Sequence, residues 1–117
     1  SITITSLDEA LVQKALKCVE DNMNNPDYSV EDLSKDLALS RVHLYRKLQS
    51  ITGQSPSDFI RSIRLKRAAQ LLQKSQLNIS EIAYEVGFNN PKYFTSCFKD
   101  EFGIPPSQFK AQNEHTD

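Results

Sequence analysis

The sequence contains few residues that interrupt helices or that build disulfide or metal sites. Only three of its 117 residues are glycine, tryptophan is absent, and there are one methionine and two cysteines. Cys18 and Cys97 belong to no CxxC pair, and only His43 and His115 could join them as metal ligands. This spacing predicts neither a metal site nor a disulfide framework, and we expect two reduced cysteines on packed helix faces.

The sequence also lacks the segments that mark membrane proteins, exported proteins and common enzymes. No apolar run approaches the roughly 20 residues of a membrane span, and the start, SITITSLDEA, has no signal-peptide pattern. No Ser/His/Asp or Cys/His constellation and no phosphate-cradling glycine loop is apparent. We therefore expect a cytoplasmic chain with no catalytic residues, no cofactor and no small-molecule ligand.

The charges are segregated along the chain, although the net charge is only −1. Residues 1–40 carry three Lys or Arg and eight Asp or Glu, residues 41–74 carry eight and one, and residues 75–117 carry three and six, which gives −5, +7 and −3. Electrostatic fields act locally, because the Debye length is only about 8 Å at physiological salt. The basic middle third is therefore a candidate surface for nucleic acid, although a solvated helix face would explain its charge equally well.

The spacing of apolar residues is helical almost everywhere, which predicts an all-α fold of about seven helices. The expected helices are 7–24, a short one after Ser29, 41–52, 56–74, 79–86, 91–102 and a last turn that begins at Pro106. Capping boxes predict three of the helix starts, at Ser6 with Glu9, Ser29 with Asp32, and Asn78 with Glu81. Strand-like alternation occurs only in SITIT, which we interpret as the remnant of a linker.

The sequence repeats itself with an offset of 49 or 50 residues. SVEDLSKDLALS aligns with NISEIAYEVGFN, and one extra asparagine then shifts the offset from 49 to 50. The paired positions include Val30 with Ile79, Leu33 with Ile82, Leu37 with Val86, Leu44 with Phe94, Leu48 with Phe98, Gly53 with Gly103 and Pro56 with Pro106. The first copy has Ala38 where the second has Gly87. Two helix pairs joined by a long linker helix indicate a duplicated, homeodomain-like helix-turn-helix.

The second helix of each copy has an apolar side and a polar side. At about 100° per residue, Leu44 and Leu48 share one side of helix 41–52, as Phe94 and Phe98 do in helix 91–102. The outward set is Val42, Tyr45, Arg46 and Gln49 in the first copy and Lys92, Thr95, Ser96 and Lys99 in the second. Any surface helix has a polar side, but the second helix of a DNA-binding helix-turn-helix presents that side to the major groove.

The side chains on these outward faces suit the edges of base pairs. Arg46 can form two hydrogen bonds with guanine O6 and N7, and Tyr45 and Val42 can contact thymine methyl groups. Lys92 can reach guanine or a phosphate. We predict base reading by Val42, Tyr45, Arg46, Gln49, Lys92, Thr95 and Ser96. For Arg46, an exposed charge that only keeps the protein soluble is the alternative.

The stretches LALSRVHLYRKLQSITGQSPSDFIRSIRLKRAAQLL and ISEIAYEVGFNNPKYFTSCFKDEFGIPPSQFK closely resemble the AraC/XylS-type DNA-binding domain of bacterial transcription regulators. The motifs that carry the resemblance are Ser40, Leu44, Leu48, Gly53, Arg64-Leu65, Ala68, Ile82-Ala83, Gly87-Phe88, Tyr93-Phe94, Phe98, Gly103 and Pro106. The resemblance covers about residues 7–112, with helix-turn-helix units at about 30–52 and 79–102 and a linker helix at about 56–74. It leaves 1–6 as a linker remnant and 113–117 as a C-terminal tail.

The resemblance implies sequence-specific binding to double-stranded promoter DNA, with two recognition helices in successive major grooves. It implies phosphate contacts from the starts of those helices and from basic groups, at Ser40, Arg41, Arg61, Asn89, Asn90 and Lys99. Members of this family usually join such a reader to a sensing, dimerising or phosphoacceptor domain. We therefore interpret the chain as a C-terminal module, resembling that of hybrid two-component regulators, and expect dimerisation through domains absent from it. An activator of this kind is nucleoid-associated, with RNA polymerase as a further expected partner.

A helical adaptor that keeps the helix-turn-helix scaffold for protein contacts alone is the alternative function. The acidic first helix and the net negative charge favour it. An adaptor should carry apolar anchors on its recognition helices. The outward residues are instead Arg, Lys, Tyr, Gln, Thr and Ser, with only Val42 apolar, and this favours DNA.

Overall fold

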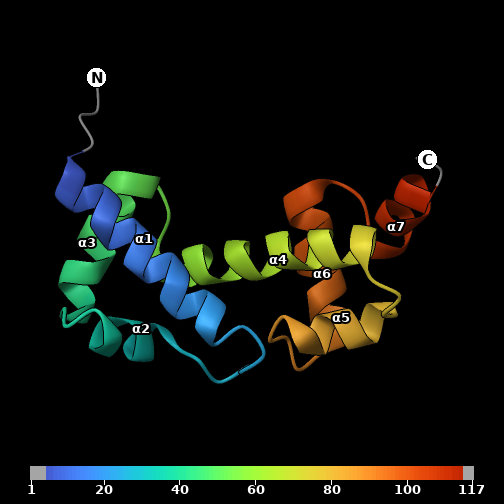
Figure 1. The fold of residues 1–117 in the computed structure, drawn as a ribbon, viewed down its shortest axis with the longest axis horizontal. Helices are drawn as coiled ribbons and strands as arrows, with labels where there is room; N and C mark the ends of the chain where they lie inside the picture. Colours follow the sequence, from blue (N-terminus) through green and yellow to red (C-terminus); the bar gives the residue numbers. More distant parts are fainter. Residues whose placement is uncertain (1–4, 115–117) are drawn as a thin grey trace. The chain divides into compact units, whose positions relative to one another are not determined.

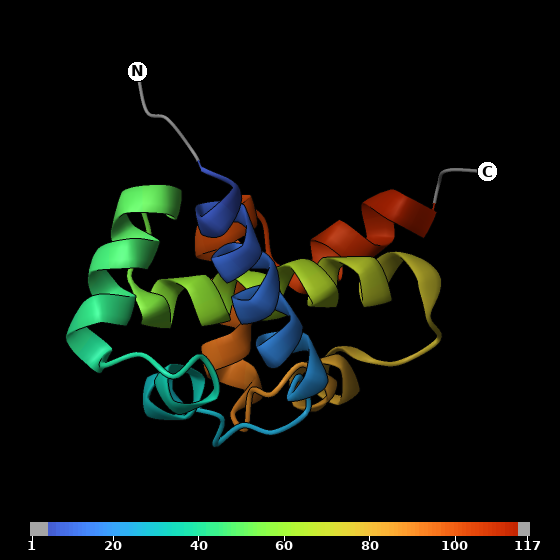
Figure 2. The same ribbon diagram turned by 60° about the vertical axis from the view of Figure 1, so that its left-hand side comes forward.

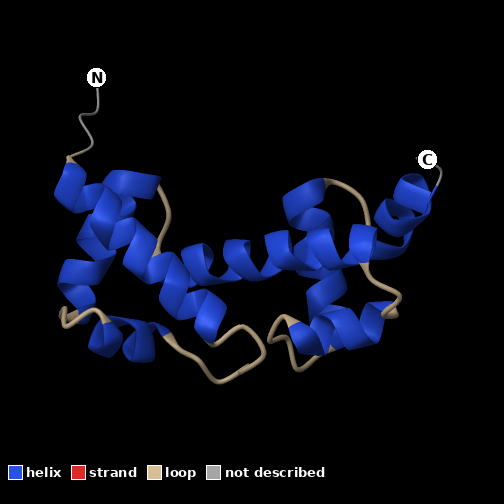
Figure 3. Cartoon of the chain, viewed as in Figure 1, coloured by secondary structure: helices blue, strands red, loops and turns tan. Residues whose placement is uncertain are grey.

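The computed structural model describes residues 5–114, and all regular structure in that part of the chain is helical (Figures 1 and 3). Its helices are α1 (Ser6–Asp21), α2 (Val30–Asp36), α3 (Arg41–Thr52), α4 (Pro56–Lys74), α5 (Ile79–Glu85), α6 (Pro91–Phe102) and α7 (Pro106–Glu114). The predicted all-α fold of about seven helices is confirmed. Most of SITIT, interpreted as a linker, lies outside the described residues.

The helices form two compact units. The first unit contains α1, α2, α3 and the start of α4, and its last residue is Ile63. The second contains the rest of α4 from Arg64, together with α5, α6, α7 and the connecting segment Met23–Asp27. Each unit holds one of the two helix pairs that the internal repeat predicts, α2 with α3 and α5 with α6.

In the first unit, α1 contacts both helices of the pair and completes their core (Figure 2). Ala15 and Val19 of α1, Leu33 of α2, and Leu44 and Leu48 of α3 are fully buried in one cluster. Burial of a valine or leucine side chain contributes about 1.5–3 kcal/mol to the free energy of folding. A pair of short helices cannot cover its own apolar stripe, so the third helix is needed to make the unit stable.

Phenylalanine side chains build much of the core of the second unit. Phe94 and Phe98 of α6 are fully buried, with ring centroids 5.8 Å apart. Phe94 meets the ring of Phe88 edge-on at 5.3 Å, and Phe98 meets Phe109 of α7 edge-on at 5.4 Å. Edge-to-face pairs of this kind contribute about 0.5–1.5 kcal/mol beyond their buried area. The apolar side of α6 is therefore occupied by its own unit, and its opposite side faces solvent.

Two of the three predicted capping boxes are confirmed, and one is wrong. The confirmed pairs are Ser29 with Asp32 and Asn78 with Glu81. Helix α1 is capped one residue earlier than predicted, by Thr5 with Asp8 rather than Ser6 with Glu9. Thr5 has the extended backbone of an N-cap, and the N–H of Asp8 donates to its Oγ1 at 3.1 Å. Ser6 therefore belongs to the helix.

Three helix ends also differ from the prediction, and the smallest difference is in α5, which ends at Glu85 instead of residue 86. Helix α1 ends at Asp21 instead of residue 24, because the Asn22 side chain donates to the carbonyl of Cys18 at 2.8 Å and closes the last turn. Helix α7 reaches Glu114 instead of forming one short turn. The Lys110 ammonium donates to the carbonyl of Leu77 at 3.4 Å, and this contact holds α7 against the segment after α4.

Helices α2 and α5 end in the same hydrogen-bonded turn, with a left-handed residue directly after the C-cap. In both turns, two backbone N–H groups donate back to carbonyls of the last helical turn, which is the Schellman arrangement. The left-handed residues are Ala38, with a φ of 56°, and Gly87, with a φ of 86°. Glycine adopts such a backbone without steric cost, whereas a residue with a Cβ is destabilised by about 1–2 kcal/mol. The first turn is therefore strained where the second is not.

Gly87 also makes room for a buried arginine. Arg64 of α4 is only 5% exposed, and burial lowers the pKa of its guanidinium. Its Nη1 donates to the carbonyls of Met23 and Val86, both at 2.7 Å, and its Nη2 donates to the carbonyl of Asn25 at 2.9 Å. Arginine stays charged in proteins, so these short, charge-assisted bonds offset the loss of water around the guanidinium. One side chain thus joins α4, the connection after α1 and the turn after α5.

Replacing Gly87 by alanine should lower the free energy of unfolding by about 3–5 kcal/mol, the usual loss when a buried charge is deprived of its partners. The new Cβ would lie 1.2 Å from Nη1 of Arg64 and 2.6 Å from the carbonyl of Met23, so the guanidinium would have to leave. Urea denaturation measures the loss.

Gly53→Ala is the matched control, because the φ of Gly53 is also positive (75°) but no atom lies within 4 Å of the added Cβ. That control should lose only about 1–2 kcal/mol. Equal losses for the two variants would contradict the packing described here.

Replacing Ala38 by glycine should raise the free energy of unfolding by about 0.5–1 kcal/mol. Relief of the left-handed strain at Ala38 stabilises the fold by about 1–2 kcal/mol. The greater freedom of glycine in the unfolded chain offsets about 0.5–1 kcal/mol of this gain. The urea midpoint should rise with an unchanged slope. Ala10→Gly, in the exposed middle of α1, should lower stability by about 1 kcal/mol. A loss in both variants would show that the Ala38 turn is not strained.

Candidate nucleic-acid interface

The outward face of α3 carries the predicted base-reading residues at the protein surface. Val42 and Tyr45 are 61% and 51% exposed, and Arg46 and Gln49 are exposed as well. Leu44, on the opposite side of the helix, is fully buried. The predicted separation of the two faces is therefore confirmed, whereas the base-reading role stays a prediction. Large exposed apolar groups on a small unit often mark a binding surface.

Two residues of the α3 region already use part of their hydrogen-bonding capacity. The Gln49 side-chain nitrogen donates to the carbonyl of Gly53 at 3.2 Å, and the Ser40 hydroxyl accepts from the N–H of His43 at 3.1 Å as the N-cap. Oε1 and the second N–H of the Gln49 amide, together with the hydroxyl hydrogen of Ser40, are left for a ligand.

The outward face of α6 is more polar than that of α3. Lys92, Ser96 and Lys99 are exposed, and Thr95 lies half-buried at the edge of the face. Serine and threonine hydroxyls discriminate less between bases than an arginine fork does. The structure thus brings the predicted α6 set to one face, with a weaker capacity to select bases than the α3 set.

The residues predicted to contact phosphates differ in how much of each side chain is available. Arg41 and Asn89 are exposed. Asn90 is the N-cap of α6, and its Oδ1 accepts from two backbone N–H groups at 2.9 and 3.2 Å, which leaves its amide nitrogen as a donor. Arg61 forms an ion pair with Asp58, one turn earlier in α4. A phosphate contact by Arg61 must therefore compete with a carboxylate.

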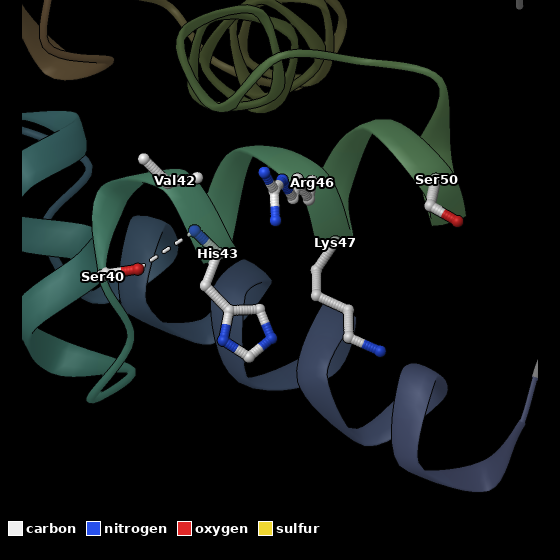
Figure 4. A pocket seen from close by; sticks show the side chains of 6 residues that line it. All are labelled: Ser40, Val42, His43, Arg46, Lys47 and Ser50. Atoms are coloured by element: carbon white, nitrogen blue, oxygen red, sulfur yellow. Dashed lines mark hydrogen bonds between the residues drawn. The ribbon is translucent and has the colours of Figure 1, made fainter.

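Two shallow hollows flank the exposed face of α3. One has a volume of about 500 Å³ and is lined by Ser40, Val42, His43, Arg46, Lys47 and Ser50, whose side chains Figure 4 shows. The other, of about 610 Å³, is lined by Val30, Arg41, Val42, Tyr45, Arg46, Ser55, Pro56 and Ser57. Val42 and Arg46 line both hollows and so lie between them.

Three side chains that line the first hollow were not among the predicted DNA contacts. His43, Lys47 and Ser50 are exposed and lie at i, i+4 and i+7, a spacing that places them on one stripe of a helix. That spacing was visible in the sequence. The prediction assigned DNA contacts to the side opposite the buried residues and to the helix start, and gave none to this flank.

Lys47 is held by an acidic residue of α1. Its Nζ lies 3.5 Å from Oδ1 of Asp8, and Asp8 also accepts from the N–H of Thr5 at 3.4 Å. Partial burial would raise the pKa of Asp8, but the hydrogen bonds with Thr5 and the positive charge of Lys47 together hold that pKa below its ordinary value. Asp8 is therefore ionised at neutral pH.

Other kinds of site find no support in the described part of the chain. Both cysteines are free and half-buried. Among the described residues no group of three or more His, Cys, Asp and Glu side chains could hold a metal ion. None of the helices between residues 5 and 114 is both long and apolar enough to cross a membrane.

The chain belongs to a known family of DNA-binding domains. A family model described as a helix-turn-helix domain matches residues 33–112. The multiple antibiotic resistance protein MarA of Salmonella typhimurium is 32% identical over 92% of this chain, and the match spans 84% of MarA. A transcriptional regulator from Chromobacterium violaceum, described as an AraC-type DNA-binding domain-containing protein, matches this chain with a TM-score of 0.86 and 28% identity. The match covers 97% of this chain and 100% of that one. The chain is a member of the AraC-type helix-turn-helix family.

Proteins of two-component systems are among its relatives. The C-terminal domain of AraT, a response regulator from Geobacillus stearothermophilus, has a TM-score of 0.81 at 29% identity over 97% of this chain and 93% of that one. Histidine kinase P4 of Formosa agariphila is 49% identical over 99% of this chain. The chain spans only 8% of that kinase. It is also 33% identical, over 84% of its own length, to the transcriptional activator RhaS of Mannheimia succiniciproducens, of which it spans 36%.

A similar domain has been solved with nucleic acid. The DNA-binding domain of AdpA, in complex with a target DNA, has a TM-score of 0.77 and 26% identity, and the match covers 90% of each chain.

Proposed function

We propose that this chain binds double-stranded promoter DNA sequence-specifically, as the output domain of a bacterial transcription regulator. The outward face of α3 carries the proposal: Val42, Tyr45 and Arg46 are exposed on a helix whose other side is fully buried. The concentration of positive charge in residues 41–74 supports it, because phosphate neutralisation supplies much of DNA affinity. The likeness to the AdpA domain solved with its target DNA supports it further.

In this proposal α3 lies in a major groove and reads base edges. Arg46 forms a bidentate contact with a guanine, Val42 and Tyr45 contact thymine methyl groups, and Gln49 offers its free side-chain oxygen to a base donor. Helix α6 enters the next major groove with three base-reading residues instead of four, namely Lys92, Thr95 and Ser96. Strict selection therefore falls mainly on the half-site read by α3.

Phosphate contacts fix the register of each unit on the duplex. They come from the helix starts and the exposed basic side chains, namely Ser40, Arg41, Arg61, Asn89, Asn90 and Lys99. Arg61 joins them only after exchanging Asp58 for a phosphate.

The boundaries and partners of the whole regulator follow from the same proposal. The reader comprises about residues 7–112, with 1–6 as part of a linker and 113–117 as a tail. A hybrid two-component regulator is the proposed parent protein, since the chain matches part of a histidine kinase and the output domain of a response regulator. Dimerisation is assigned to other domains of that protein, RNA polymerase is the proposed partner in activation, and the nucleoid is the place of action. We propose no enzymatic activity for this domain.

Arg46→Ala should weaken binding to the preferred duplex by about 1–3 kcal/mol and relax selection at one base pair. The reason is the loss of a bidentate contact with a guanine. Fluorescence anisotropy with the preferred duplex and its single-base variants measures both effects. Lys17→Ala is the control, because Lys17 pairs with Asp21 on α1, away from the reading face, and should leave base selection unchanged. If Arg46→Ala bound every duplex as the wild type does, Arg46 would not be a base reader.

Binding should weaken steeply with salt. About 6–8 phosphate contacts by two helix-turn-helix units predict a slope near −6 for the logarithm of the association constant against the logarithm of salt concentration. A titration between about 50 and 200 mM salt measures this slope. A helical adaptor that contacts only proteins would show no salt-dependent DNA binding, and a flat response would favour that function instead.

A further inference from the structure

The hollow shown in Figure 4 gathers side chains that suit an anion. It is lined by three nitrogen-bearing side chains, His43, Arg46 and Lys47, and by the hydroxyls of Ser40 and Ser50. Figure 4 shows His43 and Lys47 extending in the same direction from α3. At about 100° per residue these five positions occupy one stripe roughly 120° wide, between the outward face and the buried face.

A helix that lies in a major groove points its central face at the base edges and its flanks at the sugar–phosphate walls. The stripe formed by His43, Lys47 and Ser50 is such a flank. Phosphodiester oxygens are acceptors with a negative charge, and they are bound by cationic side chains and hydroxyls of this kind. The hollow therefore has the position and the chemistry of a backbone contact.

Lys47 is the side chain of this hollow whose charge is already engaged. Its Nζ lies 3.5 Å from Oδ1 of Asp8; the Lys47 side chain is 45% exposed and that of Asp8 is 19% exposed. Asp8 is fixed in place by its capping box with Thr5. Lysine has a flexible four-carbon stem, so its ammonium can turn from a carboxylate on one side to a phosphate on the other.

We propose that His43, Lys47 and Ser50 seat a phosphodiester of the DNA backbone in this hollow, beside the base contact of Arg46, and that Asp8 withholds Lys47 from it. Asp8 thereby lowers the affinity for all DNA sequences alike and leaves a larger share of binding to base contacts. This inference rests on the proposed function, since it concerns the same recognition helix.

Asp8→Asn tests the inference, because asparagine removes the charge and keeps a side-chain oxygen for the N–H of Thr5. The variant should bind preferred and random duplexes about 3- to 5-fold more tightly at 0.15 M salt, and its log–log salt slope should steepen by about 0.9, the value for one added phosphate contact. Glu9→Gln is the matched control, because it removes the same charge from an exposed residue of the same turn. It should leave the slope unchanged.

A double substitution separates the ion pair from a general change in charge. Lys47→Gln should abolish the effect of Asp8→Asn, so that the Lys47→Gln variant and the double variant bind DNA with the same affinity. Unfolding by urea checks that each variant is folded. If Asp8→Asn matched Glu9→Gln, or kept its effect in the Lys47→Gln background, this inference would fail while salt-dependent binding by the wild type upheld the proposed function. If the wild type bound no DNA, both would fail.

Discussion

The buried guanidinium of Arg64 is the contact on which the second unit depends. A buried charge is stable only when its hydrogen-bond donors have acceptors. Here three backbone carbonyls from two separate turns accept from the guanidinium. The arrangement requires Gly87, since any Cβ at that position would overlap the guanidinium. The turn between α5 and α6 is thereby tied to α4. The turn that leads into α6 is held by the hydrogen bond from Arg64 to the carbonyl of Val86, and the other two bonds fix the guanidinium on the connection after α1.

The two helix-turn-helix copies satisfy the same backbone geometry by different means. The second copy has glycine in its left-handed turn and an arginine packed against it, whereas the first has the strained Ala38 and a mainly aliphatic core. Their outward faces differ as well. The α3 face combines Val42, Tyr45 and Arg46 between two hollows, and the α6 face has lysines and hydroxyls. Such a division suits one copy that selects bases and a second that adds affinity and register.

Local signals explain why much of the fold was predictable. The bounds of α3 and α6 follow from an N-cap on one side and a left-handed glycine on the other, and both signals lie within the helix termini. The start of α1 was ambiguous, because Thr5 and Ser6 are both good caps and each has an acid three residues later. Arg64 was recognised as part of a motif, but its acceptors at Met23 and Asn25 lie about 40 residues away, beyond any local pattern. The pairing of Lys47 with Asp8 was hidden for the same reason.

The most direct test of the central claim, that α3 and α6 both read DNA, is selection of duplexes from a random pool by this chain. A bipartite motif is predicted, with halves about 10–10.5 base pairs apart from centre to centre. The Lys92→Ala, Ser96→Ala double variant should lose the weaker half and keep the other. Enrichment of no motif by the wild-type chain would contradict sequence-specific reading. A motif unchanged by the double variant would contradict a reading role for α6.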